Sequence, residues 1–595
     1  MRTHRVTPEL LAVARGAAPA DLLFTNARIV NVFSGEVLEG AVAIHGERIA
    51  AVLPPELARN SGPASETIDL TGAYLGPGFI DAHMHVESTM LPPREFARLA
   101  APHGTTGAVF DPHEIANELG IPGIRSLMAD AEGVPLTCMF ALSSCVPSCH
   151  LETAGARLEA ADLAPLFDDP RVVALAEMMN FPGVVNADPG VLAKINLGLE
   201  RRIVDGHSPG LTGRGLQAYV AAGITSDHEC TTIEEAREKL RLGMQVYIRE
   251  GSAARNLTAL LPLVNEKNKS RFCFCTDDRH PADLAHEGHI DHVVRLAVKA
   301  GLDPVTAIAM GSLHTARHYR RPDMGAVAPG HFADLIVFDD LRDIRPRVVL
   351  HHGRPVARDG NFLLDRTAPP PLKKRFPASG VRLPSGLSEA SFRIPVSEAA
   401  GRLATSNAVL NIRVIGMDPH QLVTEHLTLP GRIASGEYIA DFSRDILKLA
   451  VIERHKGAGN IGLGFVKGFG LKSGAIASTV GHDSHNLAVL GTNDADMLAA
   501  ARALAEVGGG QCAVREGQVL ALLPLPIAGL MSDEPAETVI DQQKILLAAT
   551  TSLGCPHHDP FMPLSFMPLP VIPRLKLSDL GLVDVERFEI VPLEA

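Results

Sequence analysis

Two closely spaced histidines in the first half of the chain have side chains that could bind a metal ion. His83 and His85 stand two residues apart in the segment FIDAHMH. Residues i and i+2 of a strand face the same way, roughly 6.6–6.8 Å apart, so both imidazoles can reach one metal ion at about 2.0–2.2 Å. Two hydrogen-bonded histidines at a strand end would give the same pattern, so this pair alone leaves the metal site open.

Further residues of the same chemical types follow along the chain and favour the metal interpretation. Glu177, His207, His228 and Asp277 each come at the end of a short apolar segment. With the first pair they provide four imidazoles and two carboxylates, enough for two metal ions that share a bridging carboxylate. Asp278 directly follows Asp277 and is the alternative ligand at that position.

The apolar segments that carry these residues alternate with helical stretches such as GRGLQAYVAAG and TIEEAREKLRLG. The expected strands lie within residues 74–83, 105–113, 135–144, 171–179, 201–209, 223–229, 244–251 and 271–278. Eight strands in such an alternation predict an α/β fold with a (β/α)8 barrel of the TIM type, which needs about 250 residues. The active site of that fold lies at the carboxyl ends of the strands, where the six candidate ligands fall.

Short alternating strands surround the expected barrel on both sides. They lie between Asp21 and Leu75 and again between His331 and Gly360, separated by turn residues. We expect these two pieces to form one composite β-sandwich over residues 1–74 and 319–365, with an amphipathic helix at the N-terminus. The barrel would then span residues 75–318.

The last third of the chain has the pattern of a separate domain. A Pro-rich, basic segment from Asp365 to Gly380 is typical of a linker. Residues 378–595 then predict a C-terminal α/β domain, with helices near Asp445–His455 and Asp494–Val507.

Two short motifs in the chain resemble known sites but lack the required surroundings. The GxGxxG pattern of Gly457, Gly459 and Gly462 follows a charged segment rather than an apolar strand, so we expect a turn-rich loop there. His85 and Glu87 match half of the zinc signature of cytidine deaminases, but no PCxxC motif supplies the cysteine ligands. Neither a dinucleotide site nor a cysteine-ligated zinc site is expected.

The composition narrows the possible partners. The 595 residues are 46% hydrophobic and carry a net charge of −13 without any acidic or basic block, which disfavours nucleic acid and an anionic membrane as partners. No apolar stretch reaches the ~20 residues of a membrane span. The eight cysteines form no CxxC pair, which favours a reducing, cytoplasmic location.

Two more polar groups could contribute to a site. The second expected strand ends in Asp111, Pro112, His113 and Glu114. Acidic residues also favour helix starts, so Asp111 and Glu114 could instead cap the following helix.

The second group lies far away in the sequence, in the segment GHDSHN of the C-terminal domain. It contains His482, Asp483 and His485. These side chains could cover the mouth of the barrel and contact a substrate, or could form a hydrogen-bonded loop within their own domain.

Longer motifs cover essentially the whole chain. They are GPGFIDAHMHVEST, FDPHEIANELG, FCTDDRHPADL, FVKGFGLKSGAIASTVGHDSHN and LPIAGLMSDEP. These motifs resemble the amidohydrolase superfamily and, within it, the adenine deaminases of the bacterial type. Many amidohydrolases bridge two metal ions with a carboxylated lysine; here Glu177 takes that place, as the resemblance implies.

The resemblance implies two divalent metal ions per chain, manganese or iron in preference to zinc. It also favours Asp277 over Asp278 as a ligand. In the implied arrangement, His83, His85 and Asp277 bind the more buried ion. His207 and His228 bind the more exposed ion, and Glu177 bridges the two.

The implied activity is hydrolytic deamination of adenine to hypoxanthine and ammonia by hydroxide attack at C6. Asp277 would move a proton to the departing amine with help from His228, and Glu114 would protonate N1 of the purine. Asp111 would position the base or relay a proton. The residues expected to contact substrate are Asp111, His113, Glu114, Asp278, His482, Asp483 and His485. The resemblance also suggests a homo-oligomer, most simply a dimer.

Two other functions are compatible with the same fold. The substrate could be another aminated ring or a cyclic amide, such as guanine or hydantoin, because a fold alone does not set the substrate. A non-catalytic scaffold, as among dihydropyrimidinase-like proteins, is the other alternative. Relatives of that kind can lose metal ligands, so the complete ligand set argues against it.

Overall fold

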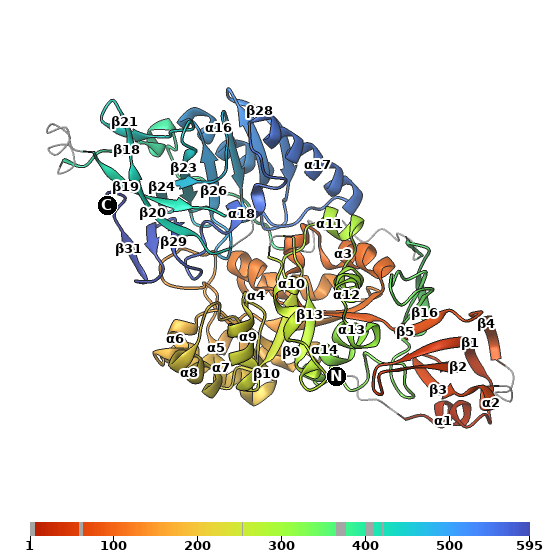
Figure 1. Cartoon of the computed structure of the whole chain (residues 1–595). Coiled ribbons are helices and arrows are strands. Elements are labelled where there is room, and N and C mark those ends of the chain that lie inside the picture. The colour runs from red at the N-terminus through yellow and green to blue at the C-terminus, as the bar shows by residue number, and fades with distance from the viewer. Residues whose placement is uncertain (1–5, 59–63, 253, 364–375, 399–408, 419–421) are drawn as a thin grey trace.

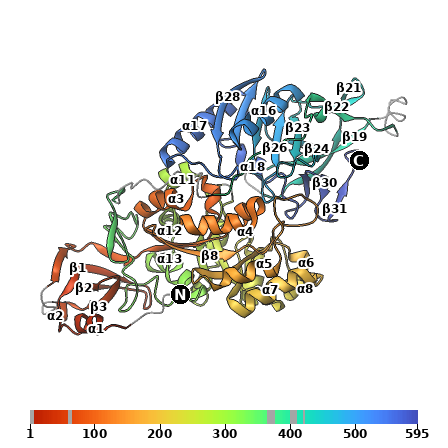
Figure 2. The ribbon, with the colours of Figure 1, turned by 180° about the vertical axis from the view of Figure 1, so that it is seen from behind.

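A computed structural model describes residues 6–595 except 59–63, 253, 364–375, 399–408 and 419–421. Figure 1 shows three parts in a row: a β-rich part, a central α/β part and a C-terminal α/β part. The view from behind in Figure 2 shows the same order. Most of the expected linker, residues 365–375, lies outside the described residues. The domain boundaries themselves stay predictions from the sequence.

The central part contains a strand at each of the eight expected positions. The first five strands pair in the order β10-β9-β8-β7-β6 and the last three in the order β11-β12-β13, all in parallel. Their bounds are β6 Phe79–Met84, β7 Thr105–Phe110, β8 Thr137–Leu142, β9 Val172–Met178, β10 Ile203–Gly206, β11 Ser226–Asp227, β12 Gln245–Arg249 and β13 Phe272–Cys275.

These strands form two sheets rather than one continuous closed sheet. Isolated bridges join the two sheets at both seams, between Val204 and Ile224 and between Met84 and Asp277. The fold class is therefore confirmed as mixed α/β with several sheets, whereas the closed barrel stays a prediction. Because the strands are parallel within each sheet and the Met84–Asp277 and Val204–Ile224 bridges are also parallel, their carboxyl ends meet on one side.

Helices of the central part connect and cover the strands. The longer ones are α3 Pro93–Ala100, α4 His113–Asp130, α7 Pro189–Arg201, α8 Gly213–Ala221, α9 Ile233–Arg241 and α12 Ile290–Lys299. The shorter ones are α5 Ala160–Leu163, α6 Phe181–Val185, α10 Leu257–Leu260, α11 Pro281–His286, α13 Pro304–Met310 and α14 Leu313–His318. Every residue of β6, β7 and β9 is buried, which explains why these strands read as continuous apolar runs in the sequence.

The β-rich part joins the two distant sequence pieces in one nine-stranded sheet. β5 (Tyr74–Pro77) from the first piece pairs antiparallel with β14 (Leu335–Phe338) from the second. The expected N-terminal helix is confirmed as α1 (Pro8–Ala14). The remaining strands are β1 Ala20–Asn31, β2 Glu36–His45, β3 Arg48–Leu53, β4 Ala64–Asp69, β15 Val348–His351, β16 Arg354–Arg358 and β17 Asn361–Phe362.

The C-terminal part is built on an eight-stranded sheet in the order β20-β19-β24-β23-β26-β25-β27-β28. Its strands are β19 Asn411–Gly416, β20 Glu425–Pro430, β23 Ile446–Ile452, β24 Ile461–Lys467, β25 Ala475–Ser478, β26 Leu487–Gly491, β27 Gly510–Arg515 and β28 Gln518–Pro524. Three helices accompany it: α16 Asp494–Val507, α17 Ala536–Ser552 and α18 Phe561–Ser565. A small sheet of β29 Leu575–Ser578, β30 Gly581–Asp584 and β31 Glu589–Val591 packs against β24.

Of the two helices expected in the C-terminal part, one is present, and the prediction of the other is wrong. α16 occupies the positions expected for a helix at Asp494–Val507. The segment expected as a helix near Asp445–His455 is instead strand β23. All seven residues of β23 are buried, and the strand pairs with β24 on one side and β26 on the other. A central strand covered on both faces has no alternating pattern, so periodicity cannot distinguish it from a buried helix.

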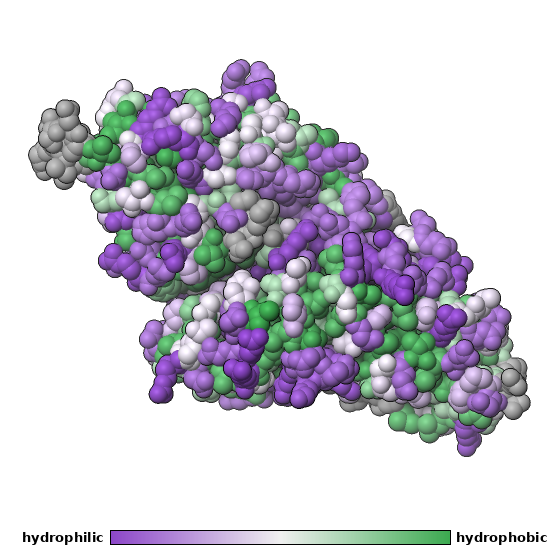
Figure 3. Space-filling view, viewed as in Figure 1, coloured by the Kyte–Doolittle hydropathy of each residue, from purple (hydrophilic) through white to green (hydrophobic). Residues whose placement is uncertain are grey.

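The face in Figure 3 carries hydrophilic residues along its whole length, interrupted by smaller hydrophobic patches. Among the helices described, none is long and apolar enough to cross a membrane.

The glycine-rich segment after β23 is explained by close backbone contacts. Residues 453–460 have no helix or strand, and Gly457 and Gly459 have positive φ angles of 67° and 91°. Gly462 lies in β24, where an added Cβ would overlap the carbonyl oxygen of Ser578 in β29. The expected turn-rich loop is confirmed.

Gly462→Ala is therefore expected to destabilise the C-terminal part by about 1–3 kcal/mol, since β24 and β29 would have to separate. Thermal unfolding followed by calorimetry measures the effect. Gly380→Ala is the control, because open space surrounds Gly380 and no positive φ applies there. Equal melting temperatures for the two variants would contradict this account of the segment.

Candidate metal centre and substrate pocket

The six candidate ligands lie together at the carboxyl ends of the central strands. His83 is in β6 and Glu177 is in β9. The other four come one or two residues after their strands. All six side chains are buried, with at most 6% of each residue exposed. The groups of side chains close enough to share a metal ion include His83 with His228 and Asp277, and Glu177 with His207 and His228.

Glu177 stands between two pairs of imidazoles. Its Oε1 lies 3.6 Å from Nε2 of His83 and 3.3 Å from Nε2 of His85. Its Oε2 lies 2.6 Å from Nδ1 of His207 and 3.2 Å from Nε2 of His228. Each oxygen of one carboxylate therefore faces a different pair of histidines, the arrangement that a bridge between two cations requires.

The hydrogen bonds around the histidines suit metal coordination. Nδ1 of His85 donates to the carbonyl oxygen of Asp111 at 3.1 Å, which leaves the lone pair of Nε2 directed at the carboxylates. Nε2 of His83 and Nε2 of His207 are buried and have no hydrogen-bond partner. Imidazole and carboxylate groups together fit divalent transition metals.

The charges of this cluster shift the pKa values of its members. Burial raises the pKa of Glu177, but the imidazoles of His207 and His228 outweigh burial and hold that pKa well below its usual range. Burial lowers the pKa of His83, but the contact with Asp277 at 3.4 Å and the charge of Glu177 outweigh it and raise that pKa. The cluster thus favours ionised carboxylates next to positively charged groups.

The position of Asp277 is set by the backbone. Its N–H donates to the carbonyl oxygen of His83 at 3.0 Å, and its carbonyl accepts from the N–H of His85 at 3.1 Å. Asp277 also has a φ of 59°, in the left-handed region that is costly for a residue with a side chain. This conformation turns Oδ1 to within 3.4 Å of His83 and 3.1 Å of His85.

Asp278 faces a different neighbour. Its Oδ1 accepts a hydrogen bond of 2.5 Å from Ser88, and burial together with the charge of Asp277 raises its pKa. Asp278 also lies close enough to His85 and Asp277 to share a metal ion with them. Of the two alternatives, Asp277 is the one that contacts both histidines of the first pair.

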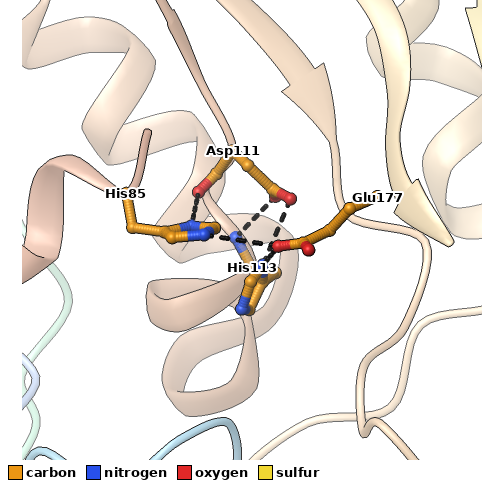
Figure 4. A group of neighbouring side chains, drawn as sticks. All are labelled: His85, Asp111, His113 and Glu177. Atoms are coloured by element: carbon orange, nitrogen blue, oxygen red, sulfur yellow. Dashed lines mark hydrogen bonds and ion pairs between the residues drawn. The ribbon is translucent and has the colours of Figure 1, made fainter. Parts of the chain in front are cut away.

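The group at the end of β7 adjoins the ligands, as Figure 4 shows. Nδ1 of His113 lies 3.1 Å from Oδ2 of Asp111 and 3.5 Å from Oε1 of Glu177. Oδ1 of Asp111 accepts from the N–H of His113 at the first residue of α4. Asp111 therefore bonds to the start of the helix and also lies beside the candidate ligands, and its part in a reaction stays a prediction.

The GHDSHN loop of the C-terminal part reaches into the same region. Nδ1 of His482 lies 2.6 Å from Oε1 of Glu114, and Nε2 of His485 contacts Oε2 of the same carboxylate. Oδ1 of Asp483 lies 3.7 Å from Nε2 of His113. The loop also has hydrogen bonds within its own part, such as that from the N–H of His485 to the carbonyl oxygen of Gly481, so it contacts both parts. Its contact with substrate stays a prediction.

Two charged residues that the sequence reasoning missed complete the polar wall. Arg249 is the last residue of β12, with both Nη atoms on Glu229 at 2.5 and 3.2 Å and Nη1 in contact with Asp277. Burial lowers the pKa of Arg249, but Glu229 and Asp277 outweigh it and raise that pKa well above its usual range. Arg249 could have been identified by its position at a strand end, and Glu229 by its position next to His228.

A small pocket of about 20 Å³, room for about one water molecule, lies beside these groups. Its polar wall includes Arg249 and Asp278, and apolar side chains of the C-terminal part line much of the rest: Leu422, Phe566, Leu569 and Ile572.

Comparisons with known proteins give the families that match parts of this chain. The profile described as "Amidohydrolase family" matches residues 74–362, and the one described as "Adenine deaminase C-terminal domain" matches residues 421–589. The chain resembles the D-hydantoinase structure from Bacillus sp. AR9 at 18% identity and a TM-score of 0.44, over 57% of this chain and 96% of that chain.

Full-length relatives are more similar. An adenine deaminase of Desulfatibacillum aliphaticivorans is 49% identical over 99% of this chain and 100% of its own length. One of Methanothrix thermoacetophila is 47% identical over 98% of this chain and 99% of its own length. The chain therefore belongs to the adenine deaminases of the amidohydrolase family.

The cluster predicts stabilisation by a divalent ion. Adding Mn²⁺ to chelator-treated protein is expected to raise the melting temperature, by an amount that corresponds to about 2.7 kcal/mol at 100 times the dissociation constant. Differential scanning fluorimetry measures the shift. Glu177→Gln should remove most of it, whereas Glu200→Gln on the exposed face of α7 should keep it. A full shift in Glu177→Gln would show that this cluster does not hold the ion.

Proposed function

We propose that this chain hydrolyses adenine to hypoxanthine and ammonia with two divalent ions held by the six candidate ligands. The observation that carries the proposal is the position of Glu177, with two imidazoles on each carboxylate oxygen. The full-length similarity to adenine deaminases supports the substrate.

The resident ions would be held by His83, His85 and Asp277 on one side of Glu177 and by His207 and His228 on the other. When bound, they supply hydroxide at neutral pH by lowering the pKa of a water molecule. Manganese or iron fits the mixed imidazole and carboxylate donors, and zinc fits them too. The strand ends that carry these ligands would form the mouth of a closed (β/α)8 barrel.

Proton transfer at C6 falls to the residues around the ligands. Oδ1 of Asp277 faces the histidines, and Oδ2 of the same carboxylate contacts Arg249. Oδ1 is therefore the oxygen that can take a proton and pass it to the departing amine. His228, 3.5 Å from Glu229, can assist the same transfer.

Proton supply to N1 of the purine falls to Glu114 with His482. Burial raises the pKa of Glu114, but His482 and His485 outweigh it and hold that pKa well below its usual range. Burial lowers the pKa of His482, but Glu114 and Asp278 outweigh it and raise that pKa to about 9. The shared proton therefore rests mainly on His482 at neutral pH, and Glu114 can relay it to N1.

Glu114→Gln is expected to lower the turnover number for adenine by about 10²–10⁴-fold, the range for loss of a general acid. Ammonia release measures turnover, and elemental analysis is expected to show unchanged metal content. Glu200→Gln serves as the control. Turnover of Glu114→Gln equal to that of the control would remove Glu114 from the mechanism.

Metal dependence and substrate identity are tested together. Elemental analysis is expected to find two ions per chain in active protein, and chelation is expected to abolish ammonia release until Mn²⁺ is restored. Fewer than one ion per chain at full activity would refute the two-ion site. Ammonia release from guanine or ring opening of hydantoin, with adenine inert, would replace the proposed substrate.

The assembly and location expected from the sequence are a homodimer in the cytoplasm, with adenine as a small-molecule partner and neither nucleic acid nor membrane. The similarity to adenine deaminases supports adenine as the substrate.

A further inference from the structure

A fully buried arginine of the C-terminal part lies where that part meets the central part. Arg454 follows β23, is 0% exposed, and donates from Nη2 to Oε1 of Glu118 at 2.5 Å and to the carbonyl oxygen of Ala528 at 2.9 Å. Its Nε donates to the carbonyl oxygen of His485. One guanidinium thus connects α4 of the central part to the loop that contacts Glu114.

These contacts close a ring around the proposed proton donor. Glu118 lies one helical turn after Glu114 on α4, so both carboxylates are on the same side of the helix. The ring runs from Glu114 to the imidazole of His485, through the carbonyl of His485 to Arg454, and from Arg454 to Glu118. In both ribbon views, α4 lies on the side of the central part that faces the C-terminal part (Figures 1 and 2).

The surroundings of Arg454 fit a fixed position. Gly529, with a φ of 72°, lies against the guanidinium, and a Cβ there would come within 2.8 Å of Nη1 and Nη2. Nδ1 of His455 lies 3.3 Å from Oε2 of Glu118, so both oxygens of this carboxylate are engaged by the C-terminal part. A planar guanidinium can serve three acceptors at fixed angles, which an ammonium group cannot.

We propose that Arg454 is a positioning residue for the deamination reaction: with Glu118 it fixes the 482–485 loop on α4, so that His482 and His485 hold Glu114 in place. The inference rests on the proposed function. It also assigns the C-terminal part a role in catalysis, because a site formed by the central part alone would lack the imidazoles of His482 and His485 on Glu114. Small displacements of a group that transfers a proton are costly even when their cause lies away from the reacting atoms.

The test compares Arg454→Met with Lys448→Met. Lys448 is a matched control: it lies on β23 itself, and its buried Nζ pairs with Asp494 at 2.5 Å and with the carbonyl oxygen of Phe392 at 2.9 Å, away from Glu114. Both variants lose a buried ion pair made by a basic residue of the C-terminal part and should show lower melting temperatures.

Only Arg454→Met is expected to lose about 100-fold in kcat for adenine, measured at a temperature where both variants are folded and with two metal ions per chain confirmed by elemental analysis. KM is expected to change less than kcat, because Glu114 acts at N1 during the reaction. Equal kcat values for the two variants would overturn the proposal.

Two further variants keep the test decisive if Arg454→Met does not fold. Arg454→Lys keeps the charge beside Glu118 but cannot also hold both carbonyl oxygens, so it should recover melting temperature without recovering kcat. Glu118→Gln keeps an acceptor of the same shape and should lower kcat by less than Arg454→Lys does. Recovery of kcat in Arg454→Lys would show a purely structural ion pair.

The outcomes also separate this inference from the proposed function. Full kcat in Arg454→Met with loss of turnover in Glu114→Gln would overturn only the role of Arg454. No ammonia release from adenine by the unaltered protein loaded with metal would overturn the proposed function itself.

Discussion

One buried carboxylate, Glu177, with two imidazoles on each of its oxygens is the interaction on which the rest of the structure depends. A buried ion is costly unless partners surround it, and these partners come from strands far apart in the sequence. Only parallel strands whose carboxyl ends meet can bring them together. At the seam between the two sheets, the bridge between Met84 and Asp277 fixes Asp277 against His83 and His85.

Glu114 in the central part also depends on partners from the C-terminal part. Glu114 is buried at the start of α4, and its two oxygens face His482 and His485 from a loop more than 360 residues later. Without that loop, Glu114 would be a buried carboxylate with His113 as its nearest imidazole. The C-terminal part therefore supplies electrostatic partners as well as the apolar wall of the pocket.

Local patterns in the sequence predicted the groups that lie at strand ends. Period-2 geometry identified His83 and His85, and the strand ends identified Glu177, His207 and His228. The same reasoning did not identify Arg249, because an arginine at a strand end is usually exposed to solvent. Its two carboxylate partners, Glu229 and Asp277, are known only from the structure. That reasoning also assigned β23 to a helix, because a strand buried on both faces loses its alternation. Contacts such as Arg454 with Glu118 join residues 336 apart, and no local spacing encodes them.

The negative charge of the side chains that line the pocket favours bound cations. Six carboxylates line it, those of Glu114, Glu177, Glu229, Asp277, Asp278 and Asp483, whereas Arg249 is the one permanent cation among the described lining residues. The remaining positive charge must come from imidazoles that take up protons, and neighbouring carboxylates do raise the pKa values of His83, His85, His113 and His207 against the effect of burial. Metal binding needs neutral imidazoles, so a divalent ion held by these ligands would displace their protons and replace their charge at the same place. The excess of buried acid thus favours positive charge here, which protonated imidazoles or bound divalent ions would supply. The proton shared by His482 and Glu114 lies outside this ligand set and would remain for the base.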